Sequence, residues 1–244
     1  MRYLIRFSYD GTSYNGFQKQ RHLDNTIQGK MELALKQINN GKDTKLTASG
    51  RTDRGVHALD QCAHFDIDID ITLYKLKCAL NSLLPEDIHV FDVLQVSDDF
   101  HARFNTKRKT YKYIINCGEY NPIERNYVYQ YCKKLDIDKM KDAIKYFLGE
   151  HDFESFTPTK DKRENYVRTI NYVNITDKND IITFTFRGNG FIKYQIRNMV
   201  GYLIRVGEGK KKGEDIPKIL EGKDRRMASI TAHSEGLYLT NVVY

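Results

Sequence analysis

Residues 47–65 read TASGRTDRGVHALDQCAHF, a stretch in which a polar loop separates two apolar segments. The loop, GRTDRG, is longer than a hairpin turn requires, and its two glycines allow backbone angles or close approaches that other residues resist. The apolar segments on its two sides predict short strands at 45–48 and 62–67. The stretch therefore predicts a strand, an ordered loop with a defined backbone conformation, and a second strand.

The segments outside this stretch predict one complete structural unit around it. Residues 2–9, RYLIRFSY, alternate as a strand does, and residues 26–38 repeat apolar side chains at helical spacing behind a threonine or asparagine cap. Downstream, leucines between 73 and 84 predict a helix that ends at Pro85, and residues 88–96 predict a strand. The expected order is β-α-β-β-α-β.

The same order returns in the second part of the chain. The expected strands lie at 109–117, 167–175, 181–187 and 236–244, and the expected helices at 140–148, 196–204 and 216–220. We therefore expect an α+β protein of two tandem split β-α-β units, ferredoxin-like or RRM-like, each with an antiparallel sheet and helices on one face. The N-terminal half, 1–100, carries the GRTDRG loop, and the C-terminal half is 101–244. If the halves join, the loop lies near the junction, a common place for a cleft.

Positive charge is concentrated in the C-terminal half. The chain has 244 residues and a formal net charge of +7, and residues 101–244 carry 27 Lys and Arg against 18 Asp and Glu. The basic side chains come in short bursts, at Arg103, Lys107, Arg108, Lys109, Lys112, Lys210, Lys211, Lys212, Lys223, Arg225 and Arg226. Such bursts favour a polyanionic partner, and solvated surface lysines are an equal alternative on charge alone.

Composition and cysteine spacing indicate a cytoplasmic globular protein. The four cysteines form no C-x-x-C pair and are expected as reduced, mostly buried thiols. The first residues lack the apolar core of a signal peptide, and no apolar run approaches the roughly 18 residues that span a bilayer. We therefore expect no membrane partner.

Asp53 is the candidate for chemistry in the GRTDRG loop. It lies between Arg51 and Arg54, and cations within a few ångströms favour the ionised form of a carboxylate. A charged, accessible carboxylate can act as a nucleophile or as a base. The structural alternative is an aspartate turn residue bridged to arginine, and physical chemistry alone favours that alternative.

Five blocks of the sequence resemble the TruA-type tRNA pseudouridine synthase family, in family order and over essentially the whole length. The loop resembles the family signature G-R-T-D-x-G-V-H-A. The other blocks are FSYDGTSYNGFQKQ at 7–20, HARFNTKRKTYKYII at 101–115, NGFIKYQIRNMVG at 189–201 and EGLYL at 235–239. The resemblance implies two related halves joined into a continuous, mostly antiparallel sheet with helices on one face, and conversion of uridine to pseudouridine.

The resemblance also implies a role for individual residues. Asp53 matches the catalytic nucleophile, Arg51 an arginine implicated in extruding the target base, and Arg197 an arginine that pairs with the catalytic carboxylate. Tyr111 matches the tyrosine stacked on the target uracil. The implied substrate is tRNA, at positions 38, 39 and 40 of the anticodon stem-loop; the implied state is a homodimer, with no metal, no organic cofactor and no DNA partner.

Three positions depart from the family pattern. Arg54 stands where a small residue is usual, Asp60 where glycine is frequent, and Ala232-His233 where the approach to the last strand is proline-rich. None of them is one of the four matched residues. The departures leave a paralogue of narrowed specificity open as an alternative.

Other interpretations compete with these assignments. Without the resemblance, Tyr111 would be predicted as a core residue of its strand and Arg197 as an ordinary surface or ion-paired arginine. His57 and His64 lie near Asp53 in sequence, but no second cluster has the spacing of metal ligands, so we expect structural histidines. The segment GEGKKKG at 207–213 is expected to cap a helix, and contact with RNA backbone is a secondary expectation for its lysines. The other residues expected to contact RNA are Arg54, Lys107, Arg108 and Lys109.

Two other functional classes remain to be separated from an isomerase. A non-catalytic RNA-binding protein would use tyrosines and basic patches, but it would have no need for a carboxylate between two arginines where phosphate must approach. A metal-dependent nuclease should show several converging carboxylates or histidines. Asp53 argues against the first class, and activity in the presence of a chelator tests the second.

Overall fold

The computed structural model describes residues 1–20, 25–158, 164–228 and 230–244. The chain forms two compact units: the first unit comprises residues 1–107 and 238–244, and the second unit comprises residues 108–237. The boundary after Lys107 lies a few residues beyond the expected division at 100, and the closing residues group with the first unit. No helix within the described residues has the length and apolar character that crossing a membrane requires.

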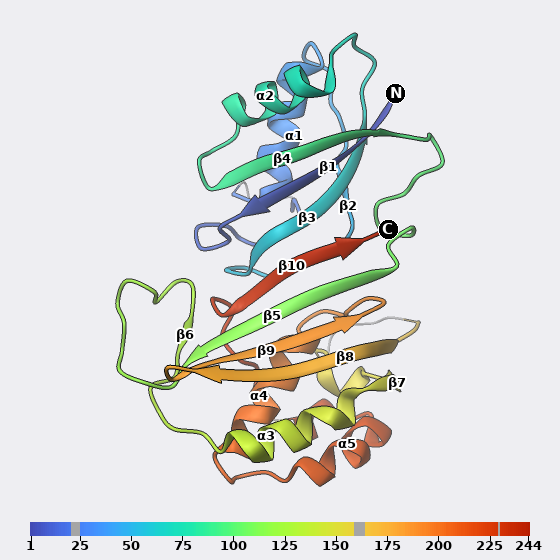
Figure 1. The fold of residues 1–244 in the computed structure, drawn as a ribbon. Helices are drawn as coiled ribbons and strands as arrows, with labels where there is room; N and C mark the ends of the chain where they lie inside the picture. The colour runs from blue at the N-terminus through green and yellow to red at the C-terminus, as the bar shows by residue number, and fades with distance from the viewer. Residues whose placement is uncertain (21–24, 159–163, 229) are drawn as a thin grey trace. The chain divides into compact units, whose positions relative to one another are not determined.

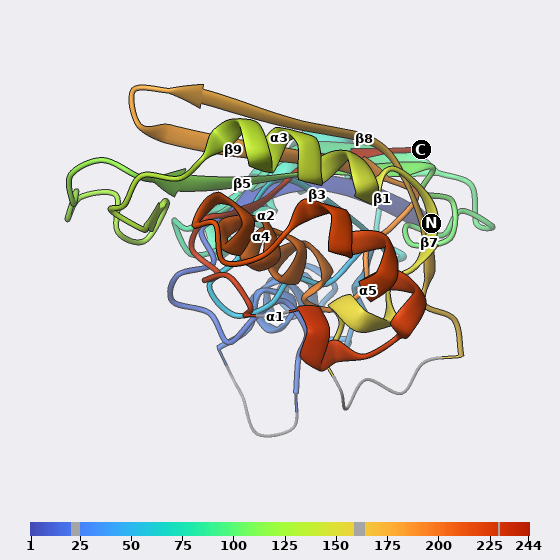
Figure 2. The same cartoon turned by 90° about the horizontal axis from the view of Figure 1, so that it is seen from below.

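The first unit is a mixed sheet with two helices on one face (Figures 1 and 2). Its elements are β1 (Arg2–Tyr9), α1 (Ile27–Ile38), β2 (Thr47–Ala48), β3 (His57–Asp66), α2 (Leu73–Leu83), β4 (Ile88–Val96) and β10 (Leu237–Val243). β1 pairs antiparallel with β3 and with β4, β2 pairs antiparallel with β3, and β10 pairs parallel with β3. The order β-α-β-β-α-β expected for residues 1–100 is confirmed.

The local sequence accounts for the helix ends of this unit. The Thr26 hydroxyl accepts the amide of Gly29 at 3.2 Å and caps α1. The hydroxyl of Thr72 caps α2 in the same way, and that helix stops before Pro85, where a helical backbone would clash with the ring.

The second unit is a mostly antiparallel sheet covered by helices on one face (Figure 2). Its strands are β5 (Arg108–Asn116), β6 (Tyr129–Gln130), β7 (Gly149–Asp152), β8 (Val167–Lys178) and β9 (Ile181–Gly188). Its helices are α3 (Ile137–Ile144), α4 (Gln195–Gly207) and α5 (Ile216–Gly222). β9 pairs antiparallel with β5 and β8, β7 adds antiparallel to β8, and the short β6 pairs parallel with β5. The α+β class and the mostly antiparallel pairing are confirmed.

Four details differ from the sequence expectation. β3 begins five residues earlier than expected, because its first residues pair with β10 on one side and with β1 on the other. The helix expected at 140–148 ends as a 3-10 turn at Lys145–Phe147, and the edge strand β7 was not predicted. All four cysteines are free, but Cys78 and Cys132 are exposed, so the expectation of mostly buried thiols is wrong for these two.

Asp60 ties three strands of the first unit together. Its buried carboxylate accepts hydrogen bonds from Arg6 Nε at 3.0 Å on β1, and from Asn241 Nδ2 and the Val242 amide, both at 3.1 Å, on β10. The Asp60 side chain therefore links β1, β3 and β10 by hydrogen bonds, which a glycine at this position could not form.

Removal of the Asp60 carboxylate should destabilise the first unit. Asp60→Ala leaves Arg6, Asn241 and the buried Val242 amide without their acceptor, which costs about 3 kcal/mol of unfolding free energy. Urea unfolding followed by circular dichroism measures this, with the exposed Asp68→Asn as the control. A loss below roughly 0.5 kcal/mol, the usual range for surface changes, would contradict this account.

Candidate active site

Asp53 lies in a closed turn between β2 and β3. The amide of Val56 donates to the Asp53 carbonyl oxygen at 3.2 Å, and Gly55 occupies the left-handed region with φ of 75°. An L-residue is strained there, so the second glycine of GRTDRG is required by the backbone. The Asp53 side chain is half-buried, whereas the side chains of Arg51 and Arg54 are exposed.

The segment after β1 fixes the backbone on one side of this loop. The amide of Phe17 donates to the Thr52 carbonyl oxygen at 3.1 Å. Gly16 has φ of 90°, and a Cβ atom there would lie 3.2 Å from the Thr52 oxygen and 3.3 Å from the Arg54 nitrogen. The sequence blocks at 7–20 and 47–65 therefore pack together around Asp53.

Two buried side chains, Tyr9 and Gln61, form hydrogen bonds to the start of the loop. The Tyr9 hydroxyl lies 2.7 Å from Thr52 Oγ1. Gln61 accepts from Ser49 Oγ at 2.8 Å and donates to the Gly50 carbonyl oxygen at 3.2 Å. Burial raises the pKa of Tyr9 to about 12, so its phenol stays neutral and acts as a hydrogen-bonding group. These contacts fix the backbone that carries Asp53 before any substrate arrives.

His57 is part of the same support. Its Nδ1 lies 3.1 Å from the Gly11 amide nitrogen and 3.1 Å from an Asp10 carboxylate oxygen, and its ring stacks on Tyr238 with centroids 4.8 Å apart. A Cβ atom on Gly11 would lie 2.0 Å from the Val56 carbonyl oxygen, so only glycine fits. The histidine thus fills a packed structural position, as expected. Among the described residues, no three His, Cys, Asp or Glu side chains gather as a potential metal site.

Tyr111 is a buried residue of β5 in the second unit. It lies opposite Phe186 of β9, and its ring meets Phe191 edge to face, with centroids 5.2 Å apart and an interplanar angle of 78°. Its exposed fraction is 7%. The core-packing contact that the strand pattern predicts is therefore present, and a stacking role would use the part of the ring that Phe191 leaves uncovered.

Arg197 is held at the first turn of α4. Its Nε donates to the Ala232 carbonyl oxygen at 2.8 Å, and its guanidinium carbon lies 5.0 Å from the ring centroid of Tyr194. The Ala232 amide donates back to the Arg197 carbonyl oxygen at 2.9 Å. Gly201 lets the 230–232 segment approach, since a Cβ there would lie 2.0 Å from the Ile230 oxygen.

A single segment before α4 contacts both predicted residues of the second unit. Phe191 packs on Tyr111, and Tyr194, three residues later, lies under the Arg197 guanidinium. Tyr194 has φ of 61° and ends the loop at the helix start. Sequence reasoning missed both aromatic residues. The signal was the pair of aromatic residues in NGFIKY, immediately before the helix.

The basic residues predicted to contact RNA differ in their exposure. Lys107 and Arg108 are exposed at the start of β5, whereas Lys109, opposite Gly188, is only 8% exposed. Lys109 is therefore a poorer candidate for contact with RNA phosphate than its two neighbours.

The segment 207–213 caps α4, as expected. α4 ends at Gly207, the amides of Glu208 and Gly209 donate back into the helix, and Lys210, Lys211 and Lys212 are exposed. Lys210 Nζ lies 3.2 Å from a Glu208 oxygen. Burial favours the neutral form of Glu208, but hydrogen bonds from Tyr131, Arg205 and Lys210 outweigh it and lower the Glu208 pKa to about 2. This carboxylate therefore offsets part of the charge of Lys210.

Comparison with known proteins agrees with the family resemblance of the five sequence blocks. A family model described as tRNA pseudouridine synthase matches residues 5–105 and 143–244. The tRNA pseudouridine synthase A of Streptococcus mutans is 43% identical over 247 residues, covering 100% of this chain and 99% of that protein. The protein of the same name from Streptococcus uberis is 44% identical, with 100% and 98% covered.

A solved structure titled "Crystal Structure of a Cbf5-Nop10-Gar1 Complex" aligns with 86% of this chain and 44% of its own, at 14% identity and a TM-score of 0.39. Similarity at that level supports no conclusion. The family match covers both units, including the Asp53 loop and the Arg197 helix, and the relatives match from end to end. The chain belongs to the tRNA pseudouridine synthase family.

Proposed function

We propose that this chain isomerises uridine to pseudouridine in tRNA, at positions 38, 39 and 40 of the anticodon stem-loop, with Asp53 as the nucleophile. The observation that carries this proposal is the Asp53 loop. Its half-buried carboxylate lies between two exposed arginines, in a member of this family. Hydrogen bonds with the Phe17 amide, the Val56 amide and the Tyr9 hydroxyl hold the loop. A loop built only as a turn would not need support from both Tyr9 and Gln61.

The chemistry needs one carboxylate and no redox step. The N-glycosidic bond breaks, the uracil turns, and a new bond joins its C5 to the sugar, so the atoms of the nucleotide are only rearranged. Asp53 attacks the sugar C1′, adds to the base or takes a sugar proton. Each route needs a flipped nucleotide in a water-excluded pocket and a cation that keeps the carboxylate ionised.

The other residues have complementary roles in this proposal. Arg51, exposed beside Asp53, extrudes the target base from the RNA stack. Tyr111 holds the uracil against its ring, and Arg197 pairs with the catalytic carboxylate. The rigid attachment of Arg197 to Ala232 and Tyr194 supports this last role, because an ion pair with a positioned arginine loses less side-chain entropy. The enzyme acts in the cytoplasm as a homodimer, without a metal or an organic cofactor.

Formation of pseudouridine should persist in excess EDTA. The rearrangement is redox-neutral and Asp53 supplies the reacting group, so no transition metal is required. Because magnesium folds tRNA, the assay uses refolded tRNA with magnesium added back as a control. Strict dependence on a transition metal ion would contradict the proposal and favour the metal-dependent class.

Affinity for tRNA should fall steeply as salt rises, because neutralised phosphates release counterions on binding. Replacing Lys211 and Lys212 with Gln should reduce the slope of log affinity against log salt by about 1 to 2, at about 0.7 to 0.9 per phosphate contact. Lys210→Gln should change it less, because Glu208 already offsets this charge. Filter binding from low to high salt measures the slopes, with the exposed Lys42→Gln as the matched control. An unchanged slope in the double variant would remove this segment from the RNA contact.

A further inference from the structure

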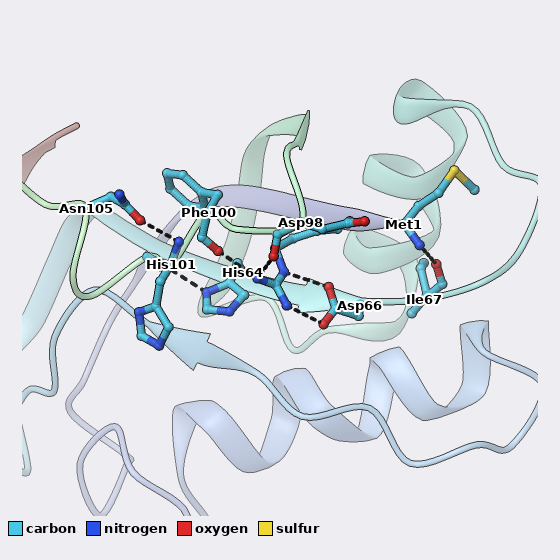
Figure 3. Close-up of polar contacts among 10 residues, drawn as sticks. Met1, His64, Asp66, Ile67, Asp98, Phe100, His101 and Asn105 are labelled. Carbon is cyan, nitrogen blue, oxygen red and sulfur yellow. Dashed lines mark hydrogen bonds and ion pairs between the residues drawn. The ribbon is translucent and has the colours of Figure 1, made fainter.

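The block HARF at 101–104 forms a turn whose backbone is fixed by buried contacts. Ala102 is fully buried, and its amide donates to His64 Nδ1 on β3 at 3.1 Å. The Ala102 carbonyl oxygen accepts from Thr106 Oγ1 at 2.7 Å and from the Tyr244 hydroxyl at 3.0 Å. Figure 3 shows His64 and His101 side by side in this cluster. The turn is therefore built on the sheet of the first unit.

His64 is suited to accept this hydrogen bond. Burial, together with the nearby charges of Arg2 and His101, lowers the pKa of His64 to about 4. The imidazole is therefore neutral at physiological pH, and Nδ1 keeps the lone pair that the Ala102 amide requires.

Three acidic side chains lie near the turn, and Arg2 pairs with one of them. The guanidinium of Arg2 pairs with both carboxylate oxygens of Asp66 at 2.8 Å and donates to the Phe100 carbonyl oxygen at 2.9 Å. Asp98 and Asp99 lie close enough to interact with the same guanidinium. Arg2 thus offsets part of the negative charge next to the turn.

The outer side of the turn presents an aromatic ring and a cation. His101 Nδ1 accepts the amides of Arg103 at 3.2 Å and of Phe104 at 3.3 Å. The imidazole stacks on the Phe104 ring, with centroids 4.2 Å apart and an interplanar angle of 28°. The Arg103 guanidinium carbon lies 5.8 Å from the centroid of the same ring. Phe104 is nevertheless 77% exposed.

We propose that Phe104, together with Arg103, is a stacking platform for a base of the tRNA other than the target uridine. An exposed phenylalanine contributes little to folding, yet this one is backed by an imidazole on a turn that three hydrogen bonds to Ala102 fix. Aromatic rings and arginine planes are the surfaces on which single-stranded bases stack. The exposed cations Lys107 and Arg108 follow the turn and complement a phosphate backbone.

The platform is distant from the catalytic loop. His64, which holds the turn, lies seven residues along β3 from His57, beside the Asp53 loop, and this corresponds to about 23 Å of extended strand. A flipped uridine at Asp53 cannot reach that far. The proposal rests on the proposed function, and it assigns to the first unit a second RNA contact for the same substrate.

Substitutions at position 104 distinguish stacking of an RNA base on Phe104 from docking of an apolar protein partner there. Phe104→Ala should weaken tRNA binding by roughly 5- to 100-fold and raise KM, with kcat at saturating tRNA unchanged. Phe104→Leu keeps apolar surface without a ring face and should lose almost as much, whereas Phe104→Trp should retain wild-type affinity. Tyr74→Ala on α2 is the matched control, because Tyr74 is 72% exposed, and it should bind normally.

The measurements are the dissociation constant for tRNA at fixed salt, kcat, KM and the sedimentation coefficient. The proposal is overturned by wild-type affinity in Phe104→Ala, by full retention in Phe104→Leu, or by a change of assembly state in place of a change in affinity. If the wild-type chain binds tRNA and makes pseudouridine, and Phe104→Ala behaves identically, only the platform is overturned. A wild-type chain that does neither overturns the proposed function as well.

Discussion

Asp53→Asn should reduce pseudouridine formation by at least about a thousandfold while the protein still folds and binds tRNA. Asparagine has nearly the same shape as aspartate, so it preserves the turn closed by the Val56 amide. It has no charge, so it can act neither as a nucleophile nor as a base. Loss of a nucleophile typically costs three or more orders of magnitude in kcat.

The control for this variant is Asp68→Asn, an exposed aspartate beyond β3 in the same unit. Rates are measured by single turnover on a tRNA transcript, with circular dichroism and tRNA binding measured on the same preparations. A folded Asp53→Asn protein with turnover within roughly tenfold of wild type would contradict the role of Asp53. Equal losses in Asp68→Asn would indicate an effect of folding or of charge on binding.

Tyr111→Ala should reduce kcat/KM by roughly ten- to a hundredfold, and Tyr111→Phe far less. Stacking of a base on an aromatic ring is worth about 1 to 3 kcal/mol by alanine substitution, and phenylalanine keeps the ring. If the hydroxyl instead transferred a proton, both variants would lose similar activity. The ratio of the two losses therefore distinguishes a stacking role from proton transfer.

The buried contact of Tyr111 with Phe191 requires a second control. Tyr111→Ala leaves a cavity in the second unit and lowers stability as well. Phe186→Ala removes the residue opposite Tyr111 on β9 and should have a comparable cost in stability. At a temperature where both variants are folded, a greater loss of activity in Tyr111→Ala reports the stacking role. Full activity in a stable Tyr111→Ala protein would exclude Tyr111 from the site.

Local sequence determines many of the element boundaries. The Thr26 hydroxyl caps α1, Pro85 follows the end of α2, and α4 ends in the glycine-rich segment at 207–213. Each boundary depends on chemistry within a few residues, such as a side-chain acceptor, a missing amide or a glycine. The α+β class was predictable for the same reason, since periods of two and of about 3.6 residues alternate along the chain.

Strand partners were less predictable, because they depend on residues far away in the sequence. The first residues of β3, HALDQ, mix polar and apolar side chains, and they form a strand because β10 and β1 lie beside them. β7 is only four residues long and pairs with β8 at the edge of the sheet. No local pattern reports such a neighbour.

The candidate site likewise combines features set by local sequence with features set by residues far apart in the chain. The GRTDRG loop and its glycines could be identified from sequence, and the left-handed backbone of Gly55 explains one of them. The support from Tyr9 and Gln61 could not, because it joins residues from different elements. The roles of Asp53, Arg51, Tyr111 and Arg197 in the reaction remain predictions.

The most direct test is to map pseudouridine in tRNA from a strain that lacks this chain and carries either the wild-type gene or the Asp53→Asn variant. The account predicts that uridines at positions 38, 39 and 40 remain unmodified in the deletion strain and with Asp53→Asn, and that the wild-type gene restores pseudouridine at these positions. Restoration of all three modifications by an Asp53→Asn protein expressed at the same level would contradict it.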